Sequence, residues 1–332
     1  MSDGGAPGRR IGPIVAIAVV ILAILAALAF WRTGSGGSGE DRQTLVVGDQ
    51  RGGVQALLQA AGELETVPYP IEWALFPAAS PLLEALGSGA VDIGSIGGSP
   101  FAFAYAGGAK IKVVFAARRS NGKGSEASAI VVLAKSPLRS IADLKGKRIA
   151  TVRGSAGQDL ALQLLERHRL RADDVKWVYL NNGEAKAALG TGDVDAWSTW
   201  GSYVGLALLK DGDRALGDGR ELAAQAGFYA ASDKAIAGKR AQLTDFLARI
   251  ARARTWALTH KEDYAAILSK ETGIPLDVAR FTVEGQIMVA TPLDDTVAAE
   301  QRAIFERYRK AGIIPKVPSL DGAFDPSFTP KF

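Results

Sequence analysis

Residues 188–203, ALGTGDVDAWSTWGSY, decide the fold of this chain, because a second copy of the same stretch lies upstream. Residues 85–100 read ALGSGAVDIGSIGGSP, and at a fixed offset of 103 positions nine of the sixteen residues are identical, without a gap. Short glycine- and alanine-rich stretches can coincide by chance, but the ungapped identity favours an internal repeat of one structural unit.

Each copy predicts the same order of local structure. A helix runs into a glycine-containing turn (87–89 and 190–192), where glycine accepts the left-handed conformation that ends a helix. An apolar strand follows (91–93 and 194–197), and a loop of small residues then begins a second helix. Alternating strands and helices predict a parallel sheet in an α/β protein, in which ligands bind beyond the carboxyl ends of the strands. Two such units predict two similar lobes with a ligand between their facing loops.

The composition excludes several classes of function. The 332 residues suffice for two lobes and a targeting segment. The net charge of +4 is spread among acidic neighbours, so we expect no nucleic-acid partner. The chain has no cysteine, which excludes disulfides, cysteine metal sites, a thiol nucleophile and a lipidated N-terminal cysteine. His168 and His260 lie in helical patterns among charged residues, where surface positions are expected. We therefore expect no metal, no cofactor and no catalytic residue.

The N-terminal region predicts a membrane segment. Residues 11–31 form a segment without a charged side chain, and this segment is long enough to cross a bilayer as a helix. Arg9 and Arg10 precede this segment, so residues 1–10 are expected in the cytoplasm and the rest of the chain outside. An uncleaved anchor is favoured over a cleaved signal segment, although small residues near 27–29 offer cleavage sites. Residues 32–43 are rich in glycine and serine and predict a flexible tether.

The remaining sequence alternates strand and helix patterns and then becomes helical. The predicted strands are 44–48, 71–75, 112–117, 129–133, 148–152, 177–180 and 227–231, and the region between residues 210 and 227 is predicted as a loop. The C-terminal helices are predicted at 240–260, 262–270, 275–288 and 295–312. We assign residues 44–124 and 229–332 to lobe 1 and residues 125–228 to lobe 2, with crossings near 120–128 and 227–231.

Two loops could contact a ligand. Gly154 and Ser155 precede a predicted helix, so their N–H groups could cradle a small oxyanion, but an ordinary tight turn explains them equally well. The absence of a following Gly-Lys-Ser/Thr excludes a phosphate-binding P-loop. Trp197 and Trp200 are predicted in a loop after a strand, either in the core or in the apolar wall of a pocket.

The chain resembles the substrate-binding proteins of ABC importers for aliphatic sulfonates, taurine and nitrate, in particular the alkanesulfonate branch. The resemblance extends in order over about residues 44–320 and is carried by VGDQRGG (47–53), FPA (76–78), LLEALGSGAVDIGS (82–95), ADLKGKRIATVRGSAGQDLAL (142–162), VYL (178–180), AALGTGDVDAWSTWGSYVGLALL (187–209) and GFYAAS (227–232).

This resemblance implies a two-lobed α/β periplasmic-binding-protein-like fold of type II, with a ligand cleft between the lobes and the N-terminal transmembrane helix in front. It implies a solute-binding protein outside the cytoplasmic membrane, in the periplasm, that passes a small organic anion, foremost an aliphatic sulfonate, to the permease and ATPase of an ABC importer. The ligand-binding residues that it implies are Gln50, Gly52, Phe76, Ser95, Gly97, Gly154, Ser155, Trp197, Trp200 and Phe228.

Two departures from the family pattern concern the ligand. Gly201 follows the second tryptophan where the alkanesulfonate branch commonly has aspartate, and Gly97-Gly98 stands where the family often has Gly-Asp. Losing two carboxylates disfavours a ligand with an amino group, and so disfavours taurine.

Alternatives remain open at this stage. The ligand could be nitrate, taurine or a pyrimidine-type compound, and the chain could be a ligand-sensing module. A small-molecule enzyme on the same fold is disfavoured, because only Asp49 and Glu126 place carboxylates near the predicted loops and the predicted cleft has no histidine or cysteine.

Overall fold

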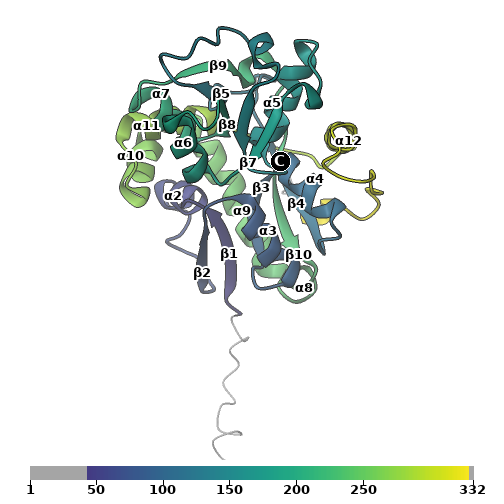
Figure 1. The fold of residues 1–332 in the computed structure, drawn as a ribbon. Helices are drawn as coiled ribbons and strands as arrows, with labels where there is room; N and C mark the ends of the chain where they lie inside the picture. The colour runs from purple at the N-terminus through teal and green to yellow at the C-terminus, as the bar shows by residue number, and fades with distance from the viewer. Residues whose placement is uncertain (1–42, 329–332) are drawn as a thin grey trace, which may run out of the picture. The chain divides into compact units, whose positions relative to one another are not determined.

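The computed structural model describes residues 43–328 of the chain. The predicted cytoplasmic N-terminus (1–10), the membrane segment (11–31) and all but the end of the tether (32–43) lie outside the described residues. Within residues 43–328 no helix has both the length and the apolar character needed to cross a bilayer. These residues form a two-lobed α/β fold built on two separate sheets (Figure 1).

The first sheet contains the N-terminal strands and two strands from late in the chain. Its strands are β1 (Leu45–Gln50), β2 (Ile71–Phe76), β3 (Ile93–Gly97), β4 (Ile111–Arg118), β10 (Gly227–Ser232) and β11 (Val289–Thr291). They lie in the order β11-β4-β10-β3-β1-β2, in which β2, β1 and β3 are parallel and β10 is antiparallel to both neighbours. The return of the chain to this sheet, β10, starts at Gly227, two residues before the start predicted for the second part of lobe 1, residue 229.

Helices cover both faces of the first sheet, so its strands are buried on both sides. One face packs against α2 (Gly53–Ala60), α9 (Arg240–Ala257), α10 (Lys261–Thr272) and α11 (Leu276–Gln286), and the other packs against α3 (Ala79–Ser88) and α4 (Gly98–Ala106). Along β1, Leu45 and Val47 face the first group and Val46 faces the second, as the alternation of side chains along a strand requires. The short helix α8 (Asp233–Gly238) joins β10 to α9.

The second sheet consists of one continuous part of the chain. Its strands are β5 (Ser128–Val132), β6 (Arg148–Thr151), β7 (Lys176–Tyr179), β8 (Ala196–Trp200) and β9 (Arg214–Asp218), in the order β7-β6-β8-β5-β9. The strands β7, β6 and β8 are parallel, and β5 is antiparallel to β8 and β9. One face packs against α5 (Ala156–Arg167) and the other against α6 (Asn182–Thr191) and α7 (Ser202–Leu209).

The internal repeat predicted from the sequence is confirmed by equivalent helix ends. Gly89 and Gly192 end α3 and α6 with φ angles of 74° and 80°, the left-handed conformation that glycine accepts most readily. In both lobes the strand that follows, β3 or β8, then enters the sheet parallel to the first strand of its unit.

The aspartate that both copies share makes the same contact in each lobe. One carboxylate oxygen of Asp92 accepts the backbone N–H of Val46 at 2.7 Å, and one of Asp195 accepts the backbone N–H of Arg148 at 2.7 Å. Each carboxylate therefore ties the start of one parallel strand to the strand beside it. A cation completes each contact: Lys239 pairs with Asp92, and the Arg148 side chain pairs with Asp195. The hydrogen bonds from the Arg148 side chain are the main reason that the pKa of Asp195 lies below its ordinary value.

Two edge strands are absent from the sequence predictions, which were wrong here. The region between residues 210 and 227, predicted as a loop, contains β9, and α11 ends at Gln286 rather than at residue 288, so that β11 can follow. Both strands are short and lie at the edges of their sheets, where a strand pairs with only one neighbour. The strand β9 forms by pairing with β5, and β11 forms by pairing with β4, so the sequence of each edge strand alone gives little signal for it.

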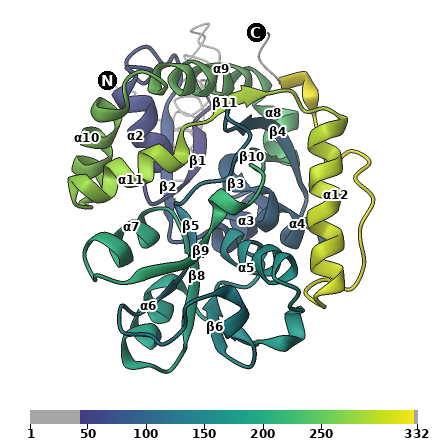
Figure 2. The ribbon, with the colours of Figure 1, turned by 90° about the horizontal axis from the view of Figure 1, so that it is seen from above.

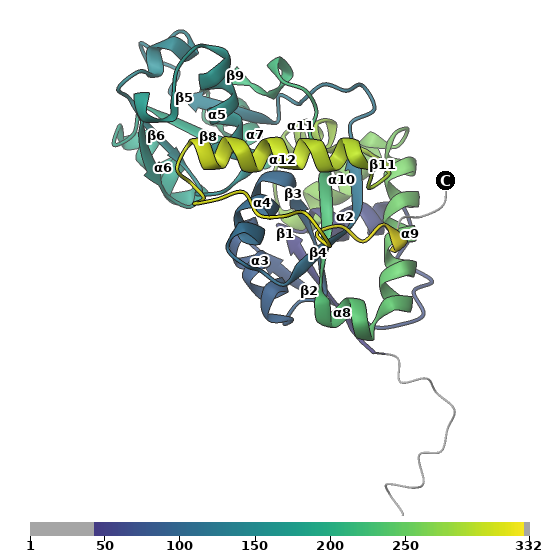
Figure 3. The ribbon, with the colours of Figure 1, turned by 90° about the vertical axis from the view of Figure 1, so that its right-hand side faces the viewer.

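The helix α12 (Asp295–Lys310) bonds to both lobes (Figures 2 and 3). On the lobe 1 side, the Gln301 amide donates to the carbonyl of Gly98 at 3.0 Å. On the lobe 2 side, the Tyr308 hydroxyl donates to the carbonyl of Ser155 at 3.0 Å, and Arg307 forms an ion pair with Asp159. The Asp159 side chain is 1% exposed and the Arg307 side chain 19%, so the carboxylate of this ion pair is almost completely removed from solvent.

Candidate functional site

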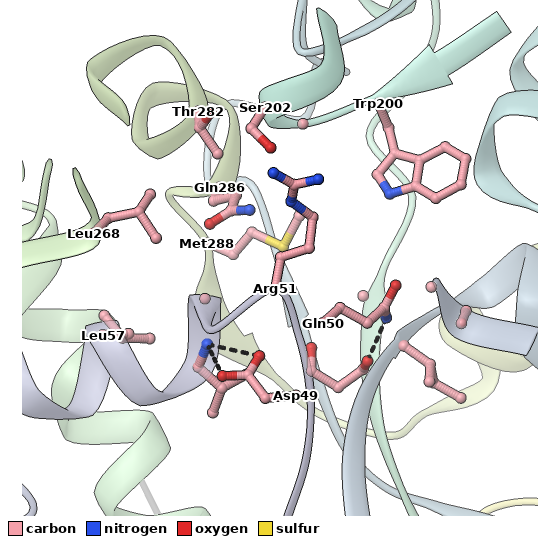
Figure 4. Close-up of a pocket in the computed structure, with 18 of the residues that line it drawn as sticks. Asp49, Gln50, Arg51, Leu57, Trp200, Ser202, Leu268, Thr282, Gln286 and Met288 are labelled. Atoms are coloured by element: carbon pink, nitrogen blue, oxygen red, sulfur yellow. Dashed lines mark hydrogen bonds between the residues drawn. The ribbon is translucent and has the colours of Figure 1, made fainter. Parts of the chain in front are cut away.

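A pocket of about 290 Å³ lies between elements of the two sheets. Lobe 1 contributes the end of β1 with the loop after it (Asp49, Gln50 and Arg51) and the end of β3, and lobe 2 contributes the segment from Trp200 to Tyr203 (Figure 4). The pocket therefore lies at the carboxyl ends of β1, β3 and β8. This is the place where ligands bind in open α/β sheets.

Arg51 is the most prominent polar side chain of the pocket. Its φ angle is 58°, a left-handed conformation that costs a non-glycine residue about 1 kcal/mol. Its guanidinium carbon lies 4.5 Å from the centre of the Tyr203 ring, so it contacts lobe 2 from lobe 1. Figure 4 shows the guanidinium directed toward Ser202 and Gln286. The strained backbone thus places a cation inside the pocket.

The carboxylate of Asp49 is occupied by the start of a helix. Asp49 is 1% exposed and accepts the backbone N–H groups of Val54, at 3.0 and 3.1 Å, and of Gln55, at 2.9 Å. These groups belong to the first turn of α2, whose N–H donors have no partner within the helix. Burial raises the pKa of Asp49, and the backbone hydrogen bonds oppose that rise. The carboxylate stabilises α2 and is not free to act as a base.

Four of the residues predicted to bind the ligand line the pocket. They are Gln50, Ser95, Gly97 and Trp200. The Gln50 amide donates to the carbonyl of Ser95 at 2.8 Å, which leaves a second amide hydrogen and the amide oxygen of Gln50 for other partners. The half-buried Trp200 ends β8 on the lobe 2 side.

The two tryptophans lie in β8, so the prediction that both lie in a loop was wrong. Of the two alternatives for Trp197, the structure shows the core: its side chain is 0% exposed and packs in the core cluster of α6 and α7. Residues three positions apart in a strand point to opposite faces, so Trp197 and Trp200 cannot share one wall.

Phe228, Phe76 and Gly52 also lie outside the pocket lining. Phe228 is buried and packs edge-on against Phe101 with 6.0 Å between the ring centres. Phe76 packs against the same core cluster at the end of β2. Gly52 precedes α2 with a φ of 77°. We assign these residues to the core and to the turn before α2.

Gly154 and Ser155 form the turn that begins α5. The Ser155 hydroxyl accepts the N–H of Gln158 at 3.2 Å, and the Gly154 N–H donates to the side-chain oxygen of Gln158 at 2.7 Å. A side chain on Gly154, whose φ is 70°, would meet Phe103 at 2.3 Å. Of this loop only Ala156 lines the pocket. The role of Ser155 as an anion ligand stays a prediction, while its role in capping α5 is visible.

Helices from the C-terminal part of the chain line the lobe 1 side of the pocket. Arg254 of α9, Tyr264 of α10 and Gln286 of α11 belong to this part, together with Tyr229 of β10. The Tyr264 hydroxyl lies 3.2 Å from the Gly53 carbonyl and 3.2 Å from the Gln286 side-chain oxygen. Burial raises the pKa of both tyrosines.

Neither of the two pocket arginines, Arg51 and Arg254, was predicted from the sequence as a ligand-binding residue. Arg51 had a usable signal, because a basic residue at the end of a strand and before two glycines is placed where backbone donors also point. Arg254 had none, since it is one of several arginines in α9 and only the packing of that helix against β10 brings it to the pocket.

Known proteins are similar to this chain in sequence and in structure. The model of the family described as "NMT1/THI5 like" matches residues 75–263. The periplasmic aliphatic sulphonate binding protein SsuA from Escherichia coli is 30% identical, with a TM-score of 0.71 over 84% of this chain and 91% of that one. The alkanesulfonate-binding protein SsuA from Xanthomonas axonopodis pv. citri, solved bound to MOPS, is 29% identical, with a TM-score of 0.78 over 87% of this chain and 99% of that one.

An enzyme shares the fold. The desulfurization enzyme DSZB is 19% identical, with a TM-score of 0.61 over 87% of this chain and 98% of that one. At this identity the likeness concerns the fold alone, so the residues of the pocket must decide between binding and catalysis.

Proposed function

Since this chain belongs to the NMT1/THI5-like family, we propose that it is the solute-binding protein of an ABC importer and that its pocket holds an aliphatic sulfonate. Its relatives are periplasmic binding proteins, which supports a place outside the cytoplasmic membrane. The observation that carries the proposal is the Arg51 guanidinium, held inside the pocket by a strained backbone and in contact with the facing lobe.

The pocket offers donors to an oxyanion and an apolar surface to a tail. A sulfonate accepts hydrogen bonds without donating any, so a guanidinium suits it, as do the amide of Gln50 and the hydroxyls of Ser95 and Ser202. The indole of Trp200 offers an apolar wall to the organic part. A ligand that bonds to Arg51 and touches Trp200 would hold the two lobes together around it.

The pocket favours a ligand without an amino group. Among the described residues that line it, Asp49 is the only one with a carboxyl group, and α2 occupies that group. An ammonium would enter without a partner beside a guanidinium. Taurine is therefore expected to bind more weakly than an alkanesulfonate of equal length.

Binding is favoured over catalysis by the same residues. His168 and His260 are exposed and do not line the pocket, and the chain has no cysteine. Asp49 is held by backbone donors, so the described lining has no free carboxylate, imidazole or thiol that could activate the hydroxyls of Ser95 and Ser202 as nucleophiles. We propose that the chain is not an enzyme.

Residues 11–31 are proposed, from their sequence, to anchor the chain in the membrane and to hold the lobes near the permease and ATPase of the importer. In spheroplasts the lobes are then expected to stay with the membrane fraction, and protease added from outside is expected to digest them. Lobes released into the periplasmic fraction would contradict the anchor, and lobes protected inside the cell would contradict the location.

Calorimetry on the full-length chain tests the binding proposal. The protein is kept in a non-ionic detergent and in Tris buffer, because sulfonate buffers would compete. Butanesulfonate is expected to bind, and Arg51→Gln to weaken it by about ten- to a hundredfold, because a hydrogen bond to a charged group contributes roughly 1.5–3 kcal/mol.

Arg153→Gln is the matched control. Arg153 follows β6 and precedes a glycine, as Arg51 follows β1 and precedes a glycine, but it is exposed and does not line the pocket. We expect this variant to bind like the unchanged chain. Equal losses in both variants would show that general charge, rather than the pocket cation, attracts the anion, and butanesulfonate that fails to bind at all would overturn the proposed function.

A further inference from the structure

A second guanidinium lines the same pocket. Arg254 comes from α9 of lobe 1, whereas Arg51 comes from the loop after β1, so the two cations approach from different elements. None of the ion pairs formed within residues 43–328 includes either of them. Two cations in a pocket of about 290 Å³ repel each other unless negative charge lies between or beside them.

The surroundings of Arg254 use little of its hydrogen-bonding capacity. One terminal nitrogen lies 3.5 Å from the Tyr229 hydroxyl, at the limit of a hydrogen bond, and the guanidinium carbon lies 5.6 Å from the centre of the Tyr229 ring. Its Nε is buried and has no partner among the described residues. A guanidinium has five N–H donors, and a buried donor without a partner is unfavourable.

The described lining residues carry more positive than negative charge. Apart from the two guanidiniums, the only lining group that ionises near neutral pH is the Asp49 carboxyl, which receives two backbone N–H groups at the positive end of α2. Even with Asp49 ionised, its carboxylate is turned to the N–H groups of α2, and two guanidiniums face one carboxylate in the lining. A single monoanion bound at Arg51 leaves the charge of Arg254 without a partner.

We propose that the preferred ligand carries two acid groups, a sulfonate that bonds to Arg51 and a second anionic group, such as a carboxylate or another sulfonate, that bonds to Arg254. This inference rests on the proposed function and narrows its substrate class. The second group supplies acceptors for the unused N–H donors of Arg254. Met288 also lines the pocket and offers an apolar contact to a carbon linker, and the volume of about 290 Å³ keeps that linker short.

The competing interpretation gives Arg254 a structural role only. In that case its guanidinium packs on the Tyr229 ring and neutralises the region around Asp49, and a second acid group on the ligand gains nothing. The two interpretations differ in one measurable quantity, the ratio of the affinities of matched one-acid and two-acid ligands.

Calorimetry with matched pairs measures that ratio. Ethanesulfonate, propanesulfonate and butanesulfonate are compared with sulfoacetate, 3-sulfopropionate, 4-sulfobutyrate and ethane-1,2-disulfonate, on the full-length chain in Tris buffer. At the best spacing we expect the two-acid ligand to bind at least about tenfold more tightly than its one-acid partner, and the advantage to shrink as salt is added.

Variants of Arg254 assign the effect. Arg254→Gln is expected to weaken the two-acid ligand at least about tenfold more than it weakens ethanesulfonate, and so to abolish the advantage of the two-acid ligand. Arg254→Lys keeps the charge and is expected to keep part of the advantage. Arg252→Gln is the control on the same helix, because the Arg252 side chain is 55% exposed and pairs with Glu63 outside the pocket.

The outcomes separate the two proposals. One-acid and two-acid ligands that bind equally well to the unchanged chain would overturn this inference and leave the proposed function intact, even if Arg254→Gln does not fold. An equal loss of both ligand types in Arg254→Gln would also overturn it. If no sulfonate of either type binds, the proposed function fails and this inference fails with it.

Discussion

Replacing Ser155 by alanine is expected to destabilise the protein without weakening sulfonate binding. The Ser155 hydroxyl accepts the N–H of Gln158 and is only 4% exposed, so its role in the structure is to cap α5. Loss of a serine cap costs about 1 kcal/mol, within a range of roughly 0.5–2 kcal/mol. If the two lobes unfold together, that loss corresponds to a decrease in Tm of about 2–4 °C.

Two further measurements make the Ser155 test decisive. Ser155→Gly is expected to lose only a few tenths of a kcal/mol, because glycine is tolerated at this helix position. Differential scanning calorimetry gives the stabilities, and titration with butanesulfonate gives the affinities of the same samples. A Ser155→Ala protein with unchanged Tm and an affinity reduced ten- to a hundredfold, roughly the loss of a hydrogen bond to a charged group, would refute the capping argument and show an anion ligand instead.

Three further perturbations test the fold and the pocket. Arg307→Met leaves the buried Asp159 carboxylate with only amide donors, so we expect a loss of about 2–4 kcal/mol in denaturant unfolding, and a much smaller loss in the double variant Arg307→Met with Asp159→Leu. The hydrogen bonds of its arginine partner lower the pKa of Asp195, so its stabilising contribution is present above about pH 4 and lost as the pH falls through the lowered pKa. The Tm difference between the unchanged chain and Asp195→Asn is therefore expected to be largest near neutral pH; a difference that stays constant into acid would contradict this. Trp197→Phe is expected to lower the Tm with little effect on butanesulfonate affinity, and Trp200→Phe to do the reverse; the opposite pattern would exchange their assignments.

The repeat unit could be predicted from sequence because each of its parts has a local cause. Glycine at positions 89 and 192 ends a helix by its own backbone preference, and the apolar residues after it suit a parallel strand whose sheet is covered by helices on both faces. The shared aspartates, Asp92 and Asp195, were visible as identities, but their contact with a neighbouring strand was not. The edge strand β9 carries no such local signal, since it depends on β5 for its hydrogen bonds.

The pocket could be predicted only on the side that the strand ends build. Gln50, Ser95 and Gly97, which the family resemblance implied, lie at strand ends, where ligands bind in open α/β sheets. Trp200 could have been separated from Trp197 by extending β8 to its true end, since the alternation of a strand then places them on opposite faces. The side built by α9, α10 and α11 depends on contacts between residues far apart in the sequence, which no local pattern reports.

The contacts of α12 have a consequence for how quickly a ligand can leave. Arg307 and Tyr308 join lobe 2 to this helix. The helices α2, which follows Arg51, and α7, whose first turn contains Tyr203, lie on the opposite side (Figures 1 and 2). A rotation of the lobes that keeps the α12 contacts widens the gap on the Arg51 side. The contacts broken there are the Arg51–Tyr203 cation–π pair, about 0.5–2 kcal/mol, the Lys210–Asp277 ion pair and the packing of α7 on α11. The residence time of the ligand is then governed by its own bonds in the pocket together with the α7–α11 contacts, and the α12 contacts, which stay intact, contribute little to it.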